Sequence, residues 1–380
     1  MKILLSIHHH LDPDSGAPGC TLKTGSHYQK MGHQVLFYSF DNLPSVLGRT
    51  FSEILFPLFL AAKIFSLVWK NNIDVIDAST ADGWVWGIIG PVLFRKRPVL
   101  VTRSHGLEHL VHRMQRAESA KGTIKPSIKN RLFGRLKLRI VQLSMRRADA
   151  VFMLNSQELA FAINNLGISP ERAFLVTHGI DRCFLGIPIT PVTAEKDTAV
   201  KIALIGSFIP RKGIHYSVPA LSRVLEQYDF VEVLFLGTGC GEKVIYDRFQ
   251  GHLHKRIEVL PHYRHQDLPT LLLHSHIVLF PSLCEGFGMT LLEAMACGLA
   301  PVASSIEGPL EFVRDTENGL LVAPGDVDLI EKALRKLITD RTLLETLRSN
   351  AHKTAQGYTW NSSAEQQIAF YQKIVVNGEW

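Results

Sequence analysis

The feature that most constrains the fold of this chain is a regular alternation of short β-rich runs with longer helical patterns. This alternation predicts parallel β-sheets covered by crossover helices, which is an α/β fold. In the first half of the chain the predicted strands are Ile3–Ile7, Val35–Phe40, Asp74–Ala78, Val99–Thr102, Val151–Leu154 and Ala173–Thr177.

The pattern pauses near the middle of the chain and then begins again. Residues 186–200, GIPITPVTAEKDTAV, are rich in Pro and Thr and lack helical periodicity, which predicts a linker. A chain of 380 residues is also too long for one ordinary core. We therefore predict an N-terminal α/β domain over 1–185, a second α/β domain over 201–355, and a C-terminal helix over 356–380 that packs back on the first domain. The predicted strands of the second domain are Lys201–Ile205, Val231–Leu236, Arg256–Leu260, Ile277–Phe280 and Pro301–Ser304.

The segments that follow these strands are the places to look for chemistry, because ligands of open parallel sheets bind outside the carboxyl ends of the strands. Two such domains joined by a linker are expected to face each other across a cleft. Four unusual stretches follow predicted strands: SGAPG from Ser15, RSHGLEH from Arg103, GSFIPRKG from Gly206, and PSLCEGFGMTLLEAMACG from Pro281.

The last of these stretches contains two glutamates, Glu285 and Glu293, on either side of a glycine turn. Good helix formers follow Gly288, so a helix is expected to begin there with its free amides exposed to an anionic ligand. The intervening turn and the helical rise suggest that the two carboxylates are about 10 Å apart, beyond the usual separation in a glycosidase pair. We therefore predict separate tasks for the two glutamates along one extended ligand.

This stretch, followed by PVASSIEGPLEFV and NGLLVAPGD, resembles the carboxyl-terminal domain of the family 4 retaining glycosyltransferases. The resemblance implies the GT-B architecture, in which two Rossmann-like domains face each other across a cleft. The domain over 1–185 is then the acceptor-side domain, and the domain over 201–355 binds the nucleotide-sugar. It also implies that Glu293 binds the ribose of a nucleotide-sugar donor and that Glu285 lies by the transferred sugar. The amides nearest the sugar and diphosphate are then those of Phe287, Gly288, Met289 and Thr290.

Three further motifs extend the resemblance over most of the chain. GSFIPRKG looks like the family's G-R-L-x-x-x-K-G, in which Arg and Lys clamp the donor diphosphate. Lys212 matches the Lys, Ser207 replaces the Arg, and Arg211 is a candidate second cation for the growing charge of the leaving group. VTRSHGLEH and THGIDRCF resemble segments of the first domain, and the former implies an active-site His105.

The glycine stretch SGAPG corresponds to the family's loop near the phosphates. Pro18 has no N–H to offer, so Gly19 is the candidate there. The implied reaction moves a sugar, of hexosyl type, from a UDP-, GDP- or ADP-sugar to a hydroxyl acceptor. Retention at the anomeric carbon is expected, and the leaving phosphate acts as the base in the mechanism proposed for the family. No metal and no cofactor are expected, since the nucleotide-sugar is itself a substrate.

Composition points to a cytoplasmic protein. The five cysteines show no metal or disulfide spacing, and the first residues, MKILLSIHHH, form a predicted strand instead of a secretory signal. The apolar run Ile54–Trp69 contains Pro57 and Lys63, so we do not predict a membrane span. Residues 121–147 hold nine Lys or Arg and no acidic residue, which suggests either a solvated helix face or contact with an anionic membrane and a lipid-linked acceptor. Nucleic acid is not expected as a partner, since no reading motif is present.

Other readings remain open at this point. A nucleotide-sugar epimerase shares the architecture and needs the same donor site. A non-catalytic scaffold that binds a nucleotide-sugar is favoured by Ser207 in place of Arg, and opposed by the presence of Lys212 with both glutamates. A dinucleotide dehydrogenase is disfavoured because GxGxxG does not follow the first strand. The run His8 to His10 follows the first predicted strand, where it can face the cleft, but three adjacent residues cannot all point the same way, so we do not predict a metal site there. The sequence Asp12-Pro13-Asp14 is read as a loop and not as a metal-binding DxD.

Overall fold

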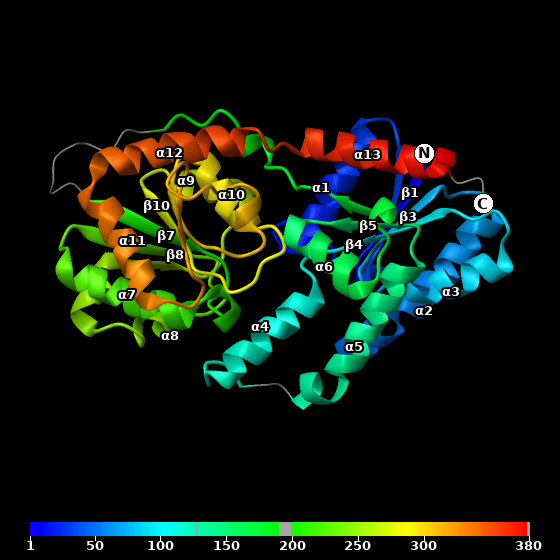
Figure 1. The fold of residues 1–380 in the computed structure, drawn as a ribbon, viewed down its shortest axis with the longest axis horizontal. Helices are drawn as coiled ribbons and strands as arrows, with labels where there is room; N and C mark the ends of the chain where they lie inside the picture. The colour runs from blue at the N-terminus through cyan, green and yellow to red at the C-terminus, as the bar shows by residue number, and fades with distance from the viewer. Residues whose placement is uncertain (126–127, 190–198, 378–380) are drawn as a thin grey trace. The chain divides into compact units, whose positions relative to one another are not determined.

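The computed structural model describes residues 1–125, 128–189 and 199–377. They form two compact units (Figure 1). The first contains Met1–Arg116, Lys125–Gly179 and Trp360–Trp380, and the second contains Ala117–Ile124 and Ile180–Thr359. Most of the linker predicted over 186–200 falls on residues 190–198, which lie outside the described part of the chain.

The first unit is built on a six-stranded sheet in the order β2-β1-β3-β4-β5-β6. All neighbouring strands run parallel. This confirms the predicted sheet, with strand ends within two residues of the expected ones. The strands are β1 (Lys2–Ser6), β2 (Gln34–Tyr38), β3 (Val75–Ser79), β4 (Val99–Arg103), β5 (Ala150–Met153) and β6 (Ala173–Leu175).

The helices of the first unit connect these strands and cover the sheet. Both β3 and β4 are buried along their whole length, as expected for strands covered on both faces. The last helix of the chain, α13, packs against α1 and β4 (red in Figure 1). The helices are α1 (Gly16–Lys30), α2 (Arg49–Trp69), α3 (Trp84–Leu93), α5 (Ile128–Arg147), α6 (Ser156–Leu166) and α13 (Trp360–Asn377). Helix α4 (Glu108–Ala120) begins in the first unit, and its residues from Ala117 onward belong to the second.

The second unit repeats the plan with a sheet of order β12-β11-β10-β7-β8-β9, again with parallel neighbours. Counted from β7, this is the strand order of the dinucleotide-binding Rossmann fold. The sequence predicted five of these strands and missed β12. They are β7 (Val200–Ile205), β8 (Val231–Leu236), β9 (Ile257–Leu260), β10 (Ile277–Phe280), β11 (Ala300–Ser304) and β12 (Leu320–Val322).

The core of the second unit lies between this sheet and its helices. Leu221, Val224 and Leu225 of α7 pack there with the strand residues, and Leu334 and Leu337 of α11 join them. The helices are α7 (Ile214–Gln227), α8 (Glu242–Tyr246), α9 (Leu268–Leu271), α10 (Met289–Ala296), α11 (Val327–Thr339) and α12 (Arg341–Gln356).

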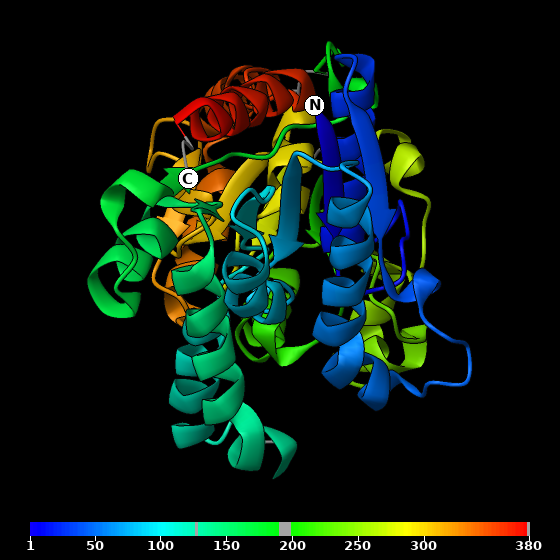
Figure 2. The same cartoon turned by 90° about the vertical axis from the view of Figure 1, so that its right-hand side faces the viewer.

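Helix α2 contains the apolar run Ile54–Trp69 and is long and apolar enough to cross a membrane. One face of it, including Phe56, Leu60 and Ile64, is fully buried in the first unit, as in a core helix. Its other face leaves large apolar side chains exposed, among them Ile54 and Trp69. Helix α3 contacts both α2 and α5, and Figure 2 turns these three helices toward the viewer.

Candidate functional site

The strand order of the second unit brings two loops together. Strands β7 and β10 are neighbours although β8 and β9 intervene in sequence, so the chain reverses its direction of travel across the sheet there. Such a switch point opens a crevice at the carboxyl ends of the two strands. The loop after β7 carries Arg211 and Lys212, and the loop after β10 carries Glu285.

The two loops are held in contact by a glycine. Residues Pro210–Lys212 form a single 3₁₀ turn, η4, that ends at Gly213 with a φ of +75°. A Cβ on Gly213 would lie 2.0 Å from the carbonyl oxygen of Pro281, so no side chain fits there. The amide of Leu283 also donates to the carbonyl of Arg211 at 2.8 Å.

The contact of these loops creates a charged cluster. Nζ of Lys212 lies 2.8 Å from Oε1 of Glu285, and Nη1 of Arg211 lies 3.1 Å from the same oxygen. Burial alone would raise the pKa of Glu285, but the charges of Lys212 and Arg211 outweigh it and lower the pKa. Glu285 is therefore ionised at neutral pH, and two cations meet one anion. The structure thus brings together three residues that the sequence singled out.

A helix begins beside this cluster, as predicted. Gly288 has a φ of +92° and caps α10. The amide of Leu291 donates to the carbonyl of Gly288, so the amides of Met289 and Thr290 lie at the helix N-terminus. The backbone of Phe287 is held against Gly308, where a Cβ would lie 2.5 Å from the Phe287 oxygen. This end of α10 can attract an anion through its amides and dipole.

Glu293 lies on α10 and has a different partner from Glu285. Its side chain is buried, and its Oε1 lies 2.7 Å from Nε2 of His265. Nδ1 of His265 lies 3.3 Å from Oδ2 of Asp181. The two glutamates are thus engaged separately, Glu285 by cations and Glu293 by an imidazole. The contact with His265 was not foreseen from the sequence, because the loop that holds it, PHYRHQ, has no regular pattern.

The first unit has its own switch point, between β1 and β3. His8 follows β1, and its Nδ1 lies 2.8 Å from Oδ1 of the buried Asp82, which follows β3. Burial raises the pKa of Asp82, although the charge of His8 acts in the opposite direction. Burial alone would lower the pKa of His8, but the charge and hydrogen bond of Asp82 outweigh burial and raise it. The sequence placed His8 directly after the first strand but did not predict its partner. The structure pairs it with the carboxylate of Asp82 at the switch point, where sheets of this kind bind ligands.

His105 lies in the loop after β4, as the resemblance implied. It lines a small cavity together with Ser6, Asp77, Arg103 and His178. Burial, followed by the charge of Arg103, places the pKa of His105 well below its usual value. The imidazole is therefore neutral at physiological pH, and can donate or accept a hydrogen bond but carries no charge.

Gly19 does not occupy a free phosphate-binding loop. It lies in the first turn of α1, and its amide donates to the carbonyl of Ser15 at 2.9 Å. Because that amide is used within the helix, the expectation that Gly19 contacts phosphate through it is not met in this structure. The residue has a steric role instead, since a Cβ there would lie 2.7 Å from the carbonyl oxygen of Pro13.

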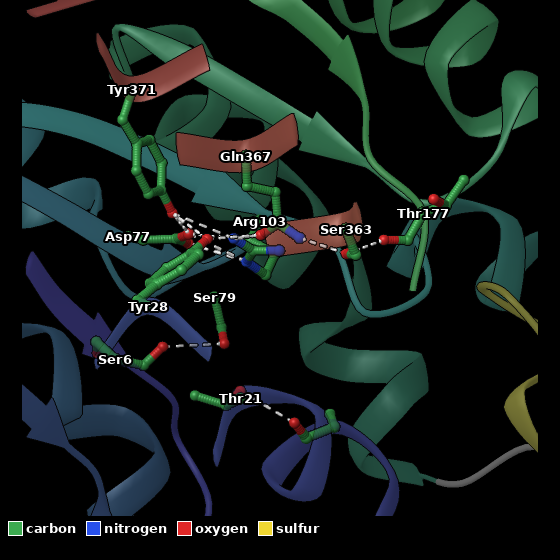
Figure 3. Close-up of polar contacts among 11 residues, drawn as sticks. Ser6, Thr21, Tyr28, Asp77, Ser79, Arg103, Thr177, Ser363, Gln367 and Tyr371 are labelled. Carbon is green, nitrogen blue, oxygen red and sulfur yellow. Dashed lines mark hydrogen bonds and ion pairs between the residues drawn. The ribbon is translucent and has the colours of Figure 1, made fainter. Parts of the chain in front are cut away.

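Asp77 and Arg103, which line the His105 cavity, belong to a buried polar network. Figure 3 shows its side chains. Arg103 of β4 pairs with Asp77 of β3, and its Nε lies 3.1 Å from both carboxylate oxygens. Helix α13 adds Gln367, which accepts from Arg103 at 2.7 Å, and Tyr371, which donates to Asp77. Tyr28 of α1 donates to Gln367 at 2.8 Å. The network ties α13 to the sheet and fixes the strand that leads to His105.

Among the described residues no group of three or more His, Cys, Asp or Glu side chains is arranged to hold a metal ion. The run His8 to His10 shows why. His8 pairs with Asp82, whereas His10 pairs with Asp41 at 2.7 Å, so the two rings have different partners. The expectation of a metal-independent site stays a prediction.

Two family models match the chain. Glycosyltransferase Family 4 matches residues 16–182, and Glycosyl transferases group 1 matches residues 189–354. The chain belongs to the family 4 glycosyltransferases. The family and enzyme class predicted from the motifs are thereby confirmed.

Curated relatives that match this glycosyltransferase include distant ones. D-inositol 3-phosphate glycosyltransferase of Kribbella flavida is 26% identical over 283 residues, which cover 70% of this chain and 65% of the relative. The matches to three such curated proteins span 46% to 65% of their length. These relatives are similar in sequence over part of their length only.

Solved structures match over nearly the whole chain. Sucrose-phosphate synthase from Thermosynechococcus elongatus has a TM-score of 0.76 at 19% identity, covering 99% of this chain and 100% of that one. Anabaena HepE in complex with UDP-glucose has a TM-score of 0.71 at 23% identity, covering 98% and 99%. These likenesses confirm the GT-B fold class, with two Rossmann-like domains.

Proposed function

We propose that this glycosyltransferase transfers a sugar, of hexosyl type, from a nucleotide-diphosphate-sugar to a hydroxyl acceptor with retention at the anomeric carbon. The observation that carries the proposal is the cluster of Lys212, Arg211 and Glu285 at the switch point of the second sheet. It lies beside the N-terminus of α10, so two cations and a helix dipole meet where an anion would bind.

The chemistry assigns a task to each group. As the bond between the anomeric carbon and the donor diphosphate breaks, negative charge grows on the leaving oxygen, and Lys212 and Arg211 stabilise it. The acceptor oxygen bonds to the anomeric carbon, and its proton goes to the leaving diphosphate. Glu285 and the amides of Phe287 to Thr290 hold the sugar and phosphate. Neutral His105 of the first unit contacts the sugar or acceptor hydroxyls.

At the other end of the donor, Glu293 accepts hydrogen bonds from the ribose hydroxyls. The base of the donor is left open among uracil, guanine and adenine. HepE, which shares the fold, was solved with UDP-glucose, and this favours UDP-glucose as the first donor to test. We retain the proposal that neither a metal nor another cofactor is needed, because the leaving charge already has two cationic partners.

The test is a thermal-shift panel of UDP, GDP, ADP and their sugars. A ligand at about one hundred times its Kd stabilises the folded state by about 2.7 kcal/mol. We expect one nucleotide and its sugars to raise the Tm strongly and the other two to have little effect. Glu293→Ala should weaken binding of the same nucleotide by about 1.5–3 kcal/mol, the range for a hydrogen bond to a charged group. A panel in which no nucleotide raises the Tm would contradict the proposed donor class.

We further propose that this enzyme works in the cytoplasm at the inner face of the membrane, on a lipid-linked acceptor. Helices α2, α3 and α5 of the first unit leave apolar side chains exposed, including Trp69 at 75% and Val92 at 82%. The described part of α5 adds exposed basic residues with no acidic residue among them, namely Arg135, Lys137, Arg139, Arg146 and Arg147.

Liposome pelleting tests this surface. Each basic residue near an anionic membrane contributes about 1 kcal/mol. We expect the protein to sediment with vesicles that contain anionic lipid and to stay in solution with neutral ones. Changing Arg135, Lys137 and Arg139 to Glu should abolish sedimentation, whereas Lys243→Glu, on an exposed position of the second unit, should not. Equal binding to both kinds of vesicle would refute the electrostatic part of the proposal.

A further inference from the structure

His265 lies between two carboxylates of the second unit. Its Nε2 contacts Oε1 of Glu293 at 2.7 Å, and its Nδ1 lies 3.3 Å from Oδ2 of Asp181. The ring also packs edge-on against the fully buried Phe184, with 5.3 Å between centroids. These three contacts fix both the position and the plane of the imidazole.

The contact matters because the terminal torsion of a glutamate has no sharp preference of its own. Glu293 is buried on α10, so its carboxylate orientation depends on the partners that it finds inside the protein. A carboxylate accepts hydrogen bonds only, and the Nε2–H of His265 therefore donates to Oε1. This leaves Oε2 in a defined orientation for a further donor.

We propose that His265 is a positioning residue for the nucleotide: it orients Glu293 so that the carboxylate accepts hydrogen bonds from the ribose hydroxyls. The proposal rests on the ribose role of Glu293 given above and adds a residue that lies outside the motif of the two glutamates. Asp181 plays the supporting part, since its carboxylate lies 3.3 Å from Nδ1 and helps to hold the ring in place. A residue that hydrogen-bonds to a ligand-binding group without contacting the ligand commonly determines how precisely that group is oriented.

The test is calorimetry with paired nucleotides. Wild type and variants are titrated with UDP, GDP and ADP and with their 2′,3′-dideoxy analogues, and the pair that binds to wild type is used. The dideoxy analogues lack the hydroxyls that Glu293 is proposed to bind. A variant that acts through Glu293 should therefore lower the affinity for the parent nucleotide and leave the affinity for the dideoxy analogue unchanged. A general disturbance of the site would weaken both equally.

The side-chain amides of Gln and Asn, introduced at position 265, distinguish the roles of the two ring nitrogens. In His265→Gln the amide reaches the place of Nε2, and in His265→Asn it reaches only the place of Nδ1. We expect His265→Asn and His265→Ala to bind the parent nucleotide about tenfold more weakly, with less than about a twofold change for the dideoxy analogue. His265→Gln should retain most of the affinity. The matched control is His262→Ala, at an exposed position of the same loop, which should change neither.

The outcomes separate the two proposals. If Glu293→Ala weakens both nucleotides of the pair equally, the ribose role fails, and the role of His265 fails with it. If Glu293→Ala discriminates between them but His265→Asn does not, only the role of His265 is overturned. If His265→Ala does not fold, the comparison of the Gln and Asn variants still decides.

Discussion

Lys212→Ala is expected to lower kcat by about 10²- to 10³-fold, the loss found when one preorganised donor to a developing charge is removed. Lys212 lies 2.8 Å from Glu285 at the switch point of the second sheet, where we place the leaving diphosphate. The charge on that diphosphate grows only as its bond to the sugar breaks. The interaction with Lys212 therefore strengthens toward the transition state, and kcat should fall by more than the donor KM rises.

Steady-state kinetics with the donor varied would measure both constants. Lys243→Ala is a suitable control, because this lysine also lies in the second unit but is 87% exposed. It should leave both constants unchanged. If Lys212→Ala raised the donor KM and left kcat intact, Lys212 would contribute to donor binding alone and not to departure of the leaving group.

Asp77→Ala is expected to destabilise the first unit by about 3–5 kcal/mol, because it leaves the Arg103 guanidinium buried without its counter-charge. Asp77 and Arg103 have side chains only 1% and 6% exposed. Burial alone would lower the pKa of Arg103, but the charge of Asp77 is the largest influence that opposes it, and the pKa is raised in the native chain. Asp77→Ala removes this compensation, so the variant bears the full cost of burying the guanidinium.

Scanning calorimetry would test this effect. The chain has two compact units, so two unfolding transitions are expected, and only the one that belongs to the first unit should shift. Asp328→Ala removes a carboxylate that also pairs with an arginine, Arg223, but is 84% exposed. It should cost less than about 1 kcal/mol, as surface pairs do. A similarly small effect of Asp77→Ala would contradict the structural role of the buried network.

Most of the fold could be predicted from the sequence because hydrophobic periodicity was strong. Eleven of the twelve strands in the described part of the chain were expected, with ends that differ by no more than two residues. The exception, β12, is only three residues long and gives too short a pattern to be distinguished from the loop around it. Strand order could not be derived in the same way, since it depends on which strands pair and not on where they lie in the chain.

The candidate site was predictable where glycines and charges lie close together in the sequence. The turn before Lys212 and the start of α10 at Gly288 are of this kind. Contacts between distant segments were not predictable. His265 meets Glu293 because the loop that carries it folds back onto α10, and its neighbours in sequence give no sign of this. Gly19 shows a different kind of error. The sequence predicted that its amide binds phosphate, whereas the structure requires glycine there because a side chain would collide with the backbone of Pro13.

Helix α13 has a consequence for how the protein is made. Tyr371, which donates to Asp77, follows it by 294 positions, so a ribosome completes the whole second unit before this partner exists. At about 5–20 residues per second, a nascent first unit waits many seconds with its charged pair lacking the groups that α13 supplies. The second unit ends at Thr359, before α13 begins, so all of its residues are synthesised before the first unit is complete. It can therefore fold first, although most of it is synthesised later. The unit whose synthesis begins first is thus the unit whose structure is completed last.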